Sequence, residues 1–317
     1  MKAVPTSKSS TGKYIPAKGK LVDKVRNLLY ISEAKRRTKL TTKYENEILD
    51  NENAEGNENL PDTTDDAIWL QNNTDPWEEV LKRWDKTFPE RQKSQCSTVH
   101  QYLEKWPILK LQKGHLLINL DFEKLYTQQS LNFYKNWQSF FGKLLKLKEP
   151  EVSNENALEI LQILNAVTEN DKKIPLQMTL FGYLVPPKGR LSRKIKFSSS
   201  EAIQGLIVQT HDAGDIDNVI QKQNQKASSV NLTVQPYILV VGKLHDFSAI
   251  YIVIDDVKYE FQSAAKAFDV LFKIYHVFHA KYPPASSHLY LIIQRKMYEI
   301  TTRYDDIPPH IVGILNL

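Results

Sequence analysis

The last third of the chain, residues 235–317, has an order of apolar segments that leaves few folds open to it. Three short apolar segments at 237–242, 250–254 and 257–261 are followed by one long helical pattern at 263–281. In the third segment apolar and charged residues alternate, which is the period of a strand with one face in water. The sequence therefore predicts a small antiparallel sheet that packs on helices near the C-terminus.

The long helical pattern is apolar on two faces. Phe268 and Leu271 fall on one face, and Val270 and Ile274 fall on the other. A helix that is apolar around most of its circumference is buried on most sides. We therefore expect this helix to pack against the sheet and to form the centre of the core.

Apolar residues also recur at helical spacing through most of the preceding sequence. The predicted helices lie near residues 76–84, 99–106, 132–147, 153–167, 199–204, 215–225 and 286–300, with Ser153, Ser199 or Ser200, and Ser286 or Ser287 as candidate N-caps. Residues 116–122 are predicted to form a short strand or a loop. The predicted fold class is α+β and helix-rich, with a helical domain at 67–150 and an α+β domain at 151–317.

The first 66 residues have a different composition from the rest. Residues 1–43 carry twelve Lys or Arg against two acids, and residues 44–66 carry nine acids and no basic residue. Such charged segments contain too few apolar residues to form a core. We interpret residues 1–66 as a disordered arm, basic at 1–43 and acidic at 44–66.

Composition excludes several classes of protein. The single cysteine, Cys96, rules out an internal disulfide and a cysteine-rich zinc site, and it fits a reducing compartment. Eleven glycines and the absence of a phosphate-binding loop motif argue against nucleotide-binding folds. No apolar run is long enough to span a membrane, and residues 1–20 lack the apolar centre of a secretory signal. We expect an intracellular protein, nuclear or cytoplasmic, without a cofactor or a metal.

Two groups of residues are candidates for a catalytic or a metal-binding site. Asp121 and the pair Asp255-Asp256 follow apolar segments, and strand-end acids of this kind hold Mg²⁺ in phosphoryl-transfer enzymes. His276 and His279 lie three residues apart on the long helix, downstream of Asp269, as part of a conceivable metal site. A tight turn explains Asp255-Asp256 more simply, and packed histidines explain the second group. We expect neither group to be a site.

Two basic clusters are candidates for contact with nucleic acid. One lies in the arm and the other in a loop marked by Pro and Gly at 186–197, where Phe197 follows the basic residues. Clustered Lys and Arg bind phosphates without sequence preference, although such runs are common on solvated surfaces. The candidate residues are Lys35, Arg36, Arg37, Lys39, Arg190, Arg193, Lys194 and Lys196.

Several segments together resemble a known family. They are WDKTFPER at 84–91, WPILKLQKGHLLINLDF at 106–122, PPKG at 186–189, SEAIQ at 200–204 and QPYILVVG at 235–242. Their order resembles the region after the SAM domain in sterile-alpha-motif-domain-containing-protein-3-like proteins of fishes and arthropods, which occur in mobile-element-like sets. The resemblance covers about residues 76–300 and implies an interaction protein. Residues 1–66 are too polar and too short to form a SAM domain.

These observations lead to one preferred function and two alternatives. We expect a non-catalytic nuclear regulatory or scaffold protein of mobile-element-like origin, with weak contact to nucleic acid through its basic arm. The first alternative is a protein–protein adaptor in which the arm acts only in targeting. The second is a remnant of a phosphoryl-transfer enzyme, which requires two or three of Asp121, Asp255, Asp256 and Asp269 to converge in one cleft.

Overall fold

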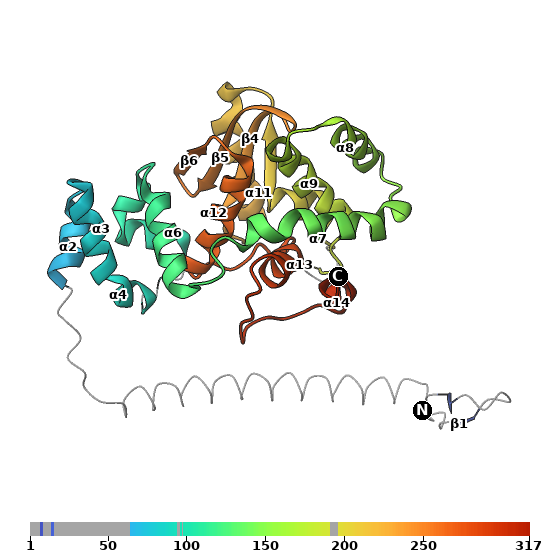
Figure 1. Cartoon of the computed structure of the whole chain (residues 1–317), viewed down its shortest axis with the longest axis horizontal. Coiled ribbons are helices and arrows are strands. Elements are labelled where there is room, and N and C mark those ends of the chain that lie inside the picture. The colour runs from blue at the N-terminus through green and yellow to red at the C-terminus, as the bar shows by residue number, and fades with distance from the viewer. Residues whose placement is uncertain (1–6, 9–13, 16–63, 94–95, 97, 191–195) are drawn as a thin grey trace. The chain divides into compact units, whose positions relative to one another are not determined.

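A computed structural model describes residues 7–8, 14–15, 64–93, 96, 98–190 and 196–317 (Figure 1). The chain divides into two compact units, Met1–Asp62 and Thr63–Leu317. In the first unit, strands β1 (Ser7–Lys8) and β2 (Tyr14–Ile15) pair in antiparallel fashion. The second unit, Thr63–Leu317, contains the rest of the described residues, and we call it the body.

Helices make up most of the body (Figure 1). Its α-helices are α2 (Thr64–Asn72), α3 (Trp77–Lys86), α4 (Phe88–Gln92), α5 (Val99–Lys105), α6 (Gly114–Leu125), α7 (Asn132–Lys148), α8 (Glu155–Ala166), α9 (Asn170–Leu184), α10 (Ser199–Gln204), α11 (Ile216–Ser229), α12 (Ala264–Val277), α13 (Ser287–Ile292) and α14 (Val312–Leu315). Short 3-10 helices lie at Pro107–Lys110, Glu149–Glu151, Ala213–Asp215 and Pro309–Ile311, and a π-helix at Ile293–Met297 extends α13.

One four-stranded sheet stands in the C-terminal half, in the order β3 (Ile207–Thr210), β4 (Tyr237–Lys243), β5 (Asp246–Ile254) and β6 (Val257–Phe261). The pairs β4–β5 and β5–β6 are antiparallel hairpins, as the sequence predicts. Strand β3 runs parallel to β4, with Ile207 opposite Ile238. The α+β class is therefore confirmed, and the sheet is mixed because α11 carries the chain back from the end of β3 to the start of β4.

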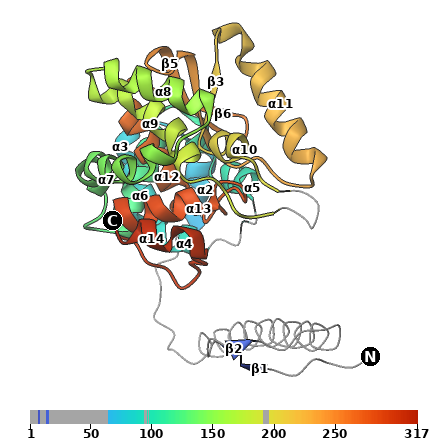
Figure 2. The same ribbon diagram turned by 90° about the vertical axis from the view of Figure 1, so that its right-hand side faces the viewer.

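The two faces of the sheet pack on different layers. Ile238, Ile252 and Tyr259 point into the main hydrophobic core with the helical part of the body. Leu239 and Val253 alternate with them and form a smaller cluster against α11. Figure 2 shows α11 apart from the other helices, on the far side of β3. Because both faces are covered, the strands of the sheet centre are apolar throughout.

Helix α12 lies at the centre of the body. Eleven of its 14 residues are buried, and it contacts β4, β5 and β6 on one side and α6 and α9 on the other. This matches the two apolar faces of the sequence pattern. The expectation that it packs between the sheet and other elements is confirmed.

The first turn of α12 is held by a carboxylate from another helix. Asp171, on α9, accepts hydrogen bonds from the backbone N–H groups of Ala264 and Ala265, each at 2.9 Å, and from the Ser263 hydroxyl at 2.8 Å. The hydroxyl oxygen of Ser263 in turn accepts from the N–H of Lys266 at 3.2 Å. Free N–H groups at a helix start are costly to bury, so Asp171 and Ser263 allow α12 to begin inside the protein.

Three local predictions need correction. Residues 116–122 lie within the helix α6, because Leu117, Ile118 and Asp121 face the core at helical spacing. The cap of α8 is Asn154, which accepts from the N–H of Ala157, rather than Ser153. The cap of α10 is Ser198, which forms a reciprocal capping box with Glu201, rather than Ser199 or Ser200.

A single hydrophobic core runs through the body across residue 150. It contains residues of α3, α6 and α7 together with residues of α9, the sheet and α12. Packing therefore joins residues 67–150 to residues 151–317.

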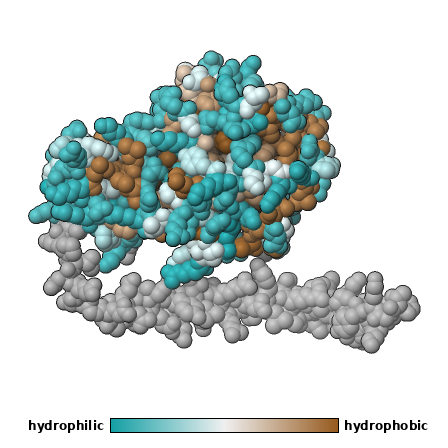
Figure 3. All heavy atoms as spheres, viewed as in Figure 1, coloured by the Kyte–Doolittle hydropathy of each residue, from teal (hydrophilic) through white to brown (hydrophobic). Residues whose placement is uncertain are grey.

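On the face of the body drawn in Figure 3, hydrophilic residues surround several apolar patches. Leu116, Leu120, Leu131 and Leu147 are among the large apolar residues that are exposed. Within the described part of the chain, no helix combines the length and the apolar character that crossing a bilayer requires.

The central position of α12 gives the first prediction. Leu271 is 1% exposed, and Leu271→Ala should lower the free energy of unfolding by about 2–5 kcal/mol because it leaves a cavity in the core. Leu147 is 47% exposed on α7, and Leu147→Ala should change the same quantity by less than about 0.5 kcal/mol. Urea denaturation of both variants measures this, and equal costs would contradict the central place of α12.

Candidate binding groove

The structure describes only part of the predicted basic sites. Lys35, Arg36, Arg37 and Lys39 lie outside the described residues, and so do Arg193 and Lys194. Arg190 and Lys196 are described, and both are exposed. They form an antiparallel bridge with each other.

The base of the basic loop is closed by backbone pairing. The N–H of Phe197 donates to the carbonyl oxygen of Gly189 at 3.4 Å, next to the bridge between Arg190 and Lys196. Gly189 also lies against the Phe197 ring, since a Cβ on this glycine would be 3.5 Å from it. The pairing places the basic side chains beside a partly buried aromatic ring.

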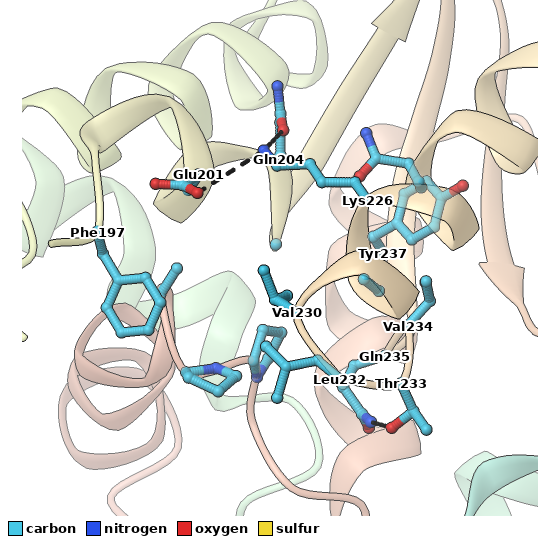
Figure 4. A pocket seen from close by; sticks show the side chains of 16 residues that line it. Phe197, Glu201, Gln204, Lys226, Val230, Leu232, Thr233, Val234, Gln235 and Tyr237 are labelled. Carbon is cyan, nitrogen blue, oxygen red and sulfur yellow. Dashed lines mark hydrogen bonds and ion pairs between the residues drawn. The ribbon is translucent and has the colours of Figure 1, made fainter. Parts of the chain in front are cut away.

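Phe197 forms one wall of an open cavity of about 170 Å³, the groove. Its lining comes from six places in the sequence: the basic loop, α10 with the residue after it, α11, the segment after α11, the start of β4 and the segment before α13. Figure 4 shows Phe197 on one side and Val230, Leu232 and Val234 on the other. Pro283, Pro284 and Ala285 complete the apolar lining.

Three polar side chains, those of Lys226, Gln204 and Glu201, lie together along one side of the groove. The Lys226 ammonium donates to the amide oxygen of Gln204 at 2.8 Å and lies 4.0 Å from a carboxylate oxygen of Glu201 (Figure 4). Glu201 also accepts from the N–H and the hydroxyl of Ser198, and these bonds hold its pKa below the usual value. The one acid that lines the groove is therefore already paired.

The segment 230–235, which we call the strap, joins α11 to β4 along the groove. It begins with Asn231 in the left-handed region at φ 55. The N–H of Asn231 donates to Ser228, and the N–H of Leu232 donates to the carbonyl of Ala227 at 2.9 Å. This is the Schellman arrangement, which needs a left-handed residue and favours Gly or Asn there. It turns Leu232 back toward Ala227, and both line the groove.

Two buried polar atoms at the end of the strap have no hydrogen-bond partner. They are the amide oxygen of Gln235 and the hydroxyl of Tyr237, and both residues line the groove. Burial raises the pKa of Tyr237 to about 12, so its hydroxyl keeps its proton and remains a donor. A buried polar group without a partner costs about 1–3 kcal/mol, so these two atoms destabilise the junction between the strap and β4.

A second cavity of about 270 Å³ lies on the other side of the strap. Leu232, Thr233, Val234 and Gln235 line both cavities. The strap is therefore packed loosely on two sides.

His100 and Asp255 stand at the outer end of the second cavity. The distance from His100 Nδ1 to the Asp255 carboxylate is 2.6 Å, and this contact raises the pKa of His100. Asp255 occupies the two-residue turn between β5 and β6 in the left-handed region, at φ 54. The turn interpretation of Asp255-Asp256 is confirmed. The His100 side chain is 63% exposed, so the pair is a surface contact.

The acid predicted at the end of an apolar strand, Asp121, has a structural partner. It lies in α6 and accepts two hydrogen bonds from the Arg91 guanidinium, each at 2.7 Å, and one from the Trp84 indole at 2.9 Å. The guanidinium also stacks 3.6 Å from the Trp84 ring centre. Burial raises the pKa of Asp121, and Arg91 offsets part of that effect. The group holds α3, α4 and α6 together.

Of the other predicted site, Asp269 and His276 have partners in the interior, while His279 is exposed. Asp269 accepts from Lys273 and from the Tyr298 hydroxyl, both at 2.7 Å. His276 lies 3.0 Å from the hydroxyls of Tyr126 and Tyr282. No cluster of three His, Cys, Asp or Glu side chains arranged for a metal occurs among the residues that the structure describes.

The acids named for the enzyme alternative thus lie in separate places. Asp121 pairs with Arg91, Asp269 pairs with Lys273, and Asp255 contacts His100 on the surface. Asp121 is inside a helix, which removes the strand end on which its prediction depended.

The sequence did not point to the strap or to Pro283 as parts of a groove. The signals were present in the form of Asn231 after a polar helix and the Pro283-Pro284 pair. Each marks a turn of the chain, and neither indicates which other segment lies beside it in space. Of the apolar residues that line the groove, the sequence associates only Phe197 with a candidate binding site, the basic loop.

Comparisons of the chain with models of known protein families, with curated proteins and with solved structures return no match. The resemblance in the motif segments therefore stays a prediction.

The Asp121 pair gives a second prediction. Asp121→Asn leaves the Arg91 charge buried without a carboxylate and should lower the free energy of unfolding by about 3–5 kcal/mol. Replacing both partners, as Arg91→Met with Asp121→Leu, should cost much less because no charge stays buried. The exposed pair of Lys110 and Glu104 is the control, and Glu104→Gln should leave the free energy of unfolding nearly unchanged, because water screens a surface pair. A cost for Asp121→Asn as small as the control would show that the buried pair does not hold α3, α4 and α6.

Buried histidines give a third prediction, on pH. Burial lowers the pKa of both His276 and His288 to about 4. In the unfolded chain a histidine has a pKa near ~6.5, so on acidification the unfolded state binds protons first. The contribution of these two histidines to stability should be constant above pH about 6.5 and should fall toward pH about 4, by roughly 1.4 kcal/mol per histidine for each pH unit.

Chemical denaturation across this pH range measures the slope. His276→Gln should remove about half of the contribution of these two residues and so give a shallower decline. A decline of the same steepness in this variant would assign the effect to other groups.

Proposed function

We propose that the protein is a non-catalytic scaffold or adaptor that binds a partner chain in the groove. The observation that supports this most directly is the groove itself, an open apolar cavity whose wall includes Phe197, next to the bridge between the exposed Arg190 and Lys196. Apolar pockets with a few polar groups at the rim are the usual form of a recognition site. Glu201 and Lys226 offset each other in the groove wall, so the exposed Arg190 and Lys196 next to Phe197 make the surroundings positively charged.

The arrangement of the acids argues for binding rather than catalysis. A phosphoryl-transfer site needs carboxylates that converge on metal ions in one cleft. Asp121 and Asp269 each have a buried cation as partner, and Asp255 is on the surface. The proposal therefore assigns these acids to folding and assigns the groove to function.

The nuclear and nucleic-acid parts of the proposal rest on the basic residues of the arm. Lys35, Arg36, Arg37 and Lys39 form a compact positive segment of the kind that acts in nuclear import or in contact with phosphates. Mobile-element-like origin rests on the resemblance alone. The adaptor function of the groove does not depend on either.

A site-specific cross-linker tests the proposal in cells. With p-benzoylphenylalanine in place of Val230, which lines the groove, a defined partner should be cross-linked and should survive nuclease treatment. The same replacement at Val312, exposed on α14, is the control and should give no such product. Recovery from the nuclear fraction would support the nuclear assignment.

A charge change provides the matched comparison. Lys226→Glu should lower the cross-linking yield, because Lys226 lines the groove, whereas Lys222→Glu one turn away on the same helix should not. Equal yields at Val230 and Val312, or a product that nuclease removes, would contradict a protein-binding groove.

A further inference from the structure

The size and lining of the groove define what kind of group it accepts. Its volume of about 170 Å³ is close to the roughly 150 Å³ of an apolar cavity that holds a benzene ring. Phe197, Leu232 and Pro283 contribute apolar walls. The groove therefore fits one large apolar side chain.

The two polar atoms without a partner indicate what kind of ligand backbone carries the apolar side chain. The amide oxygen of Gln235 needs a donor, and the hydroxyl of Tyr237 needs an acceptor. An extended peptide offers an N–H and a carbonyl oxygen at every residue. A sugar–phosphate backbone offers acceptors almost alone, so a peptide matches this pair better than a nucleic acid does.

The charges near the groove indicate which residues flank the apolar side chain in a ligand. Arg190 and Lys196 are exposed and pair with each other next to Phe197, which lines the groove, and Lys226 lies in the wall. The carboxylate of Glu201 is occupied by Ser198 and Lys226. The field at the rim is therefore positive and favours acidic residues in a ligand.

We infer that the groove binds an extended acidic peptide with one bulky apolar side chain, and that the strap moves when this peptide binds. The inference rests on the proposed function and names its class of partner. Movement is required because the Gln235 oxygen and the Tyr237 hydroxyl are buried in the free protein. Movement is feasible because a cavity lies on each side of the strap.

Binding of a synthetic peptide to the full chain tests the inference. The probe is a short fluorescein-labelled peptide of Asp and Glu with a single central Leu, measured by fluorescence anisotropy. Binding should saturate, and Phe197→Ala should weaken it roughly tenfold, as expected for an aromatic anchor. Lys226→Glu should weaken it and Lys222→Glu should not. Replacing the central Leu of the peptide by Ser should remove binding.

A second pair of variants separates recognition from folding. Tyr237→Phe removes a hydroxyl that has no partner, so the melting temperature of the free protein should rise while the affinity for the peptide falls. Tyr259→Phe removes a hydroxyl that donates to the carbonyl of Leu109 in the core. It should lower the melting temperature and leave the affinity unchanged. Opposite signs of this kind do not arise from a purely structural role of Tyr237.

Three results would overturn the inference. They are no saturable binding of the acidic peptide, unchanged affinity in Tyr237→Phe, and displacement of the peptide by single-stranded DNA at equal or lower concentration. If the Val230 cross-linker captures a protein while the acidic peptide does not bind, the groove has a partner of another chemistry. In that case the proposed function stands and this inference fails.

Discussion

The burial of α12 is the constraint on which the rest of the body depends. A helix with two apolar faces needs a layer on each side, and here the sheet covers one side while α6 and α9 cover the other. Burial also requires a partner for each polar group on the helix, because a polar atom that is buried without a partner loses its hydrogen bonds to water and costs about 1–3 kcal/mol. Asp171 holds its first turn, and Lys273 neutralises Asp269.

The helical end of the body follows the same principle. The Arg91 guanidinium and the Asp121 carboxylate are 0% and 1% exposed, and together with Trp84 they satisfy one another across three helices. Some buried polar atoms of the described residues have no partner, among them the Tyr102 hydroxyl and the Trp106 indole nitrogen. The Gln235 oxygen and the Tyr237 hydroxyl differ from these two because they belong to residues that line an apolar groove. Buried polar atoms without a hydrogen-bond partner are a local inconsistency of the kind that is typical of functional sites.

The fold class and most elements follow from the sequence, for reasons that can be named. The alternation at Val257–Phe261 and the double apolar face of α12 are patterns that burial imposes directly. The sequence does not predict the helix at residues 116–122, because Leu116 and Leu120 are apolar although they are exposed. They widen the apolar stripe of α6 beyond its buried face and hide the helical period. The parallel pairing of β3 depends on a crossover through α11, which no local pattern encodes. The groove is assembled from helices, a strand and loops that are separate in the sequence, and their proximity is a tertiary property.

Native-state hydrogen exchange tests the account most directly, since it measures local stability along the whole chain. The account requires a rigid centre at α12 and β4, and a strap that opens independently of it. The amides of α12 should exchange only through global unfolding, while those of Leu232, Thr233 and Val234 should exchange by a local opening far below that free energy. Addition of the acidic peptide should slow the strap and leave α12 unchanged. Exchange of the strap at the global rate, or local opening of α12 ahead of the strap, would contradict the account.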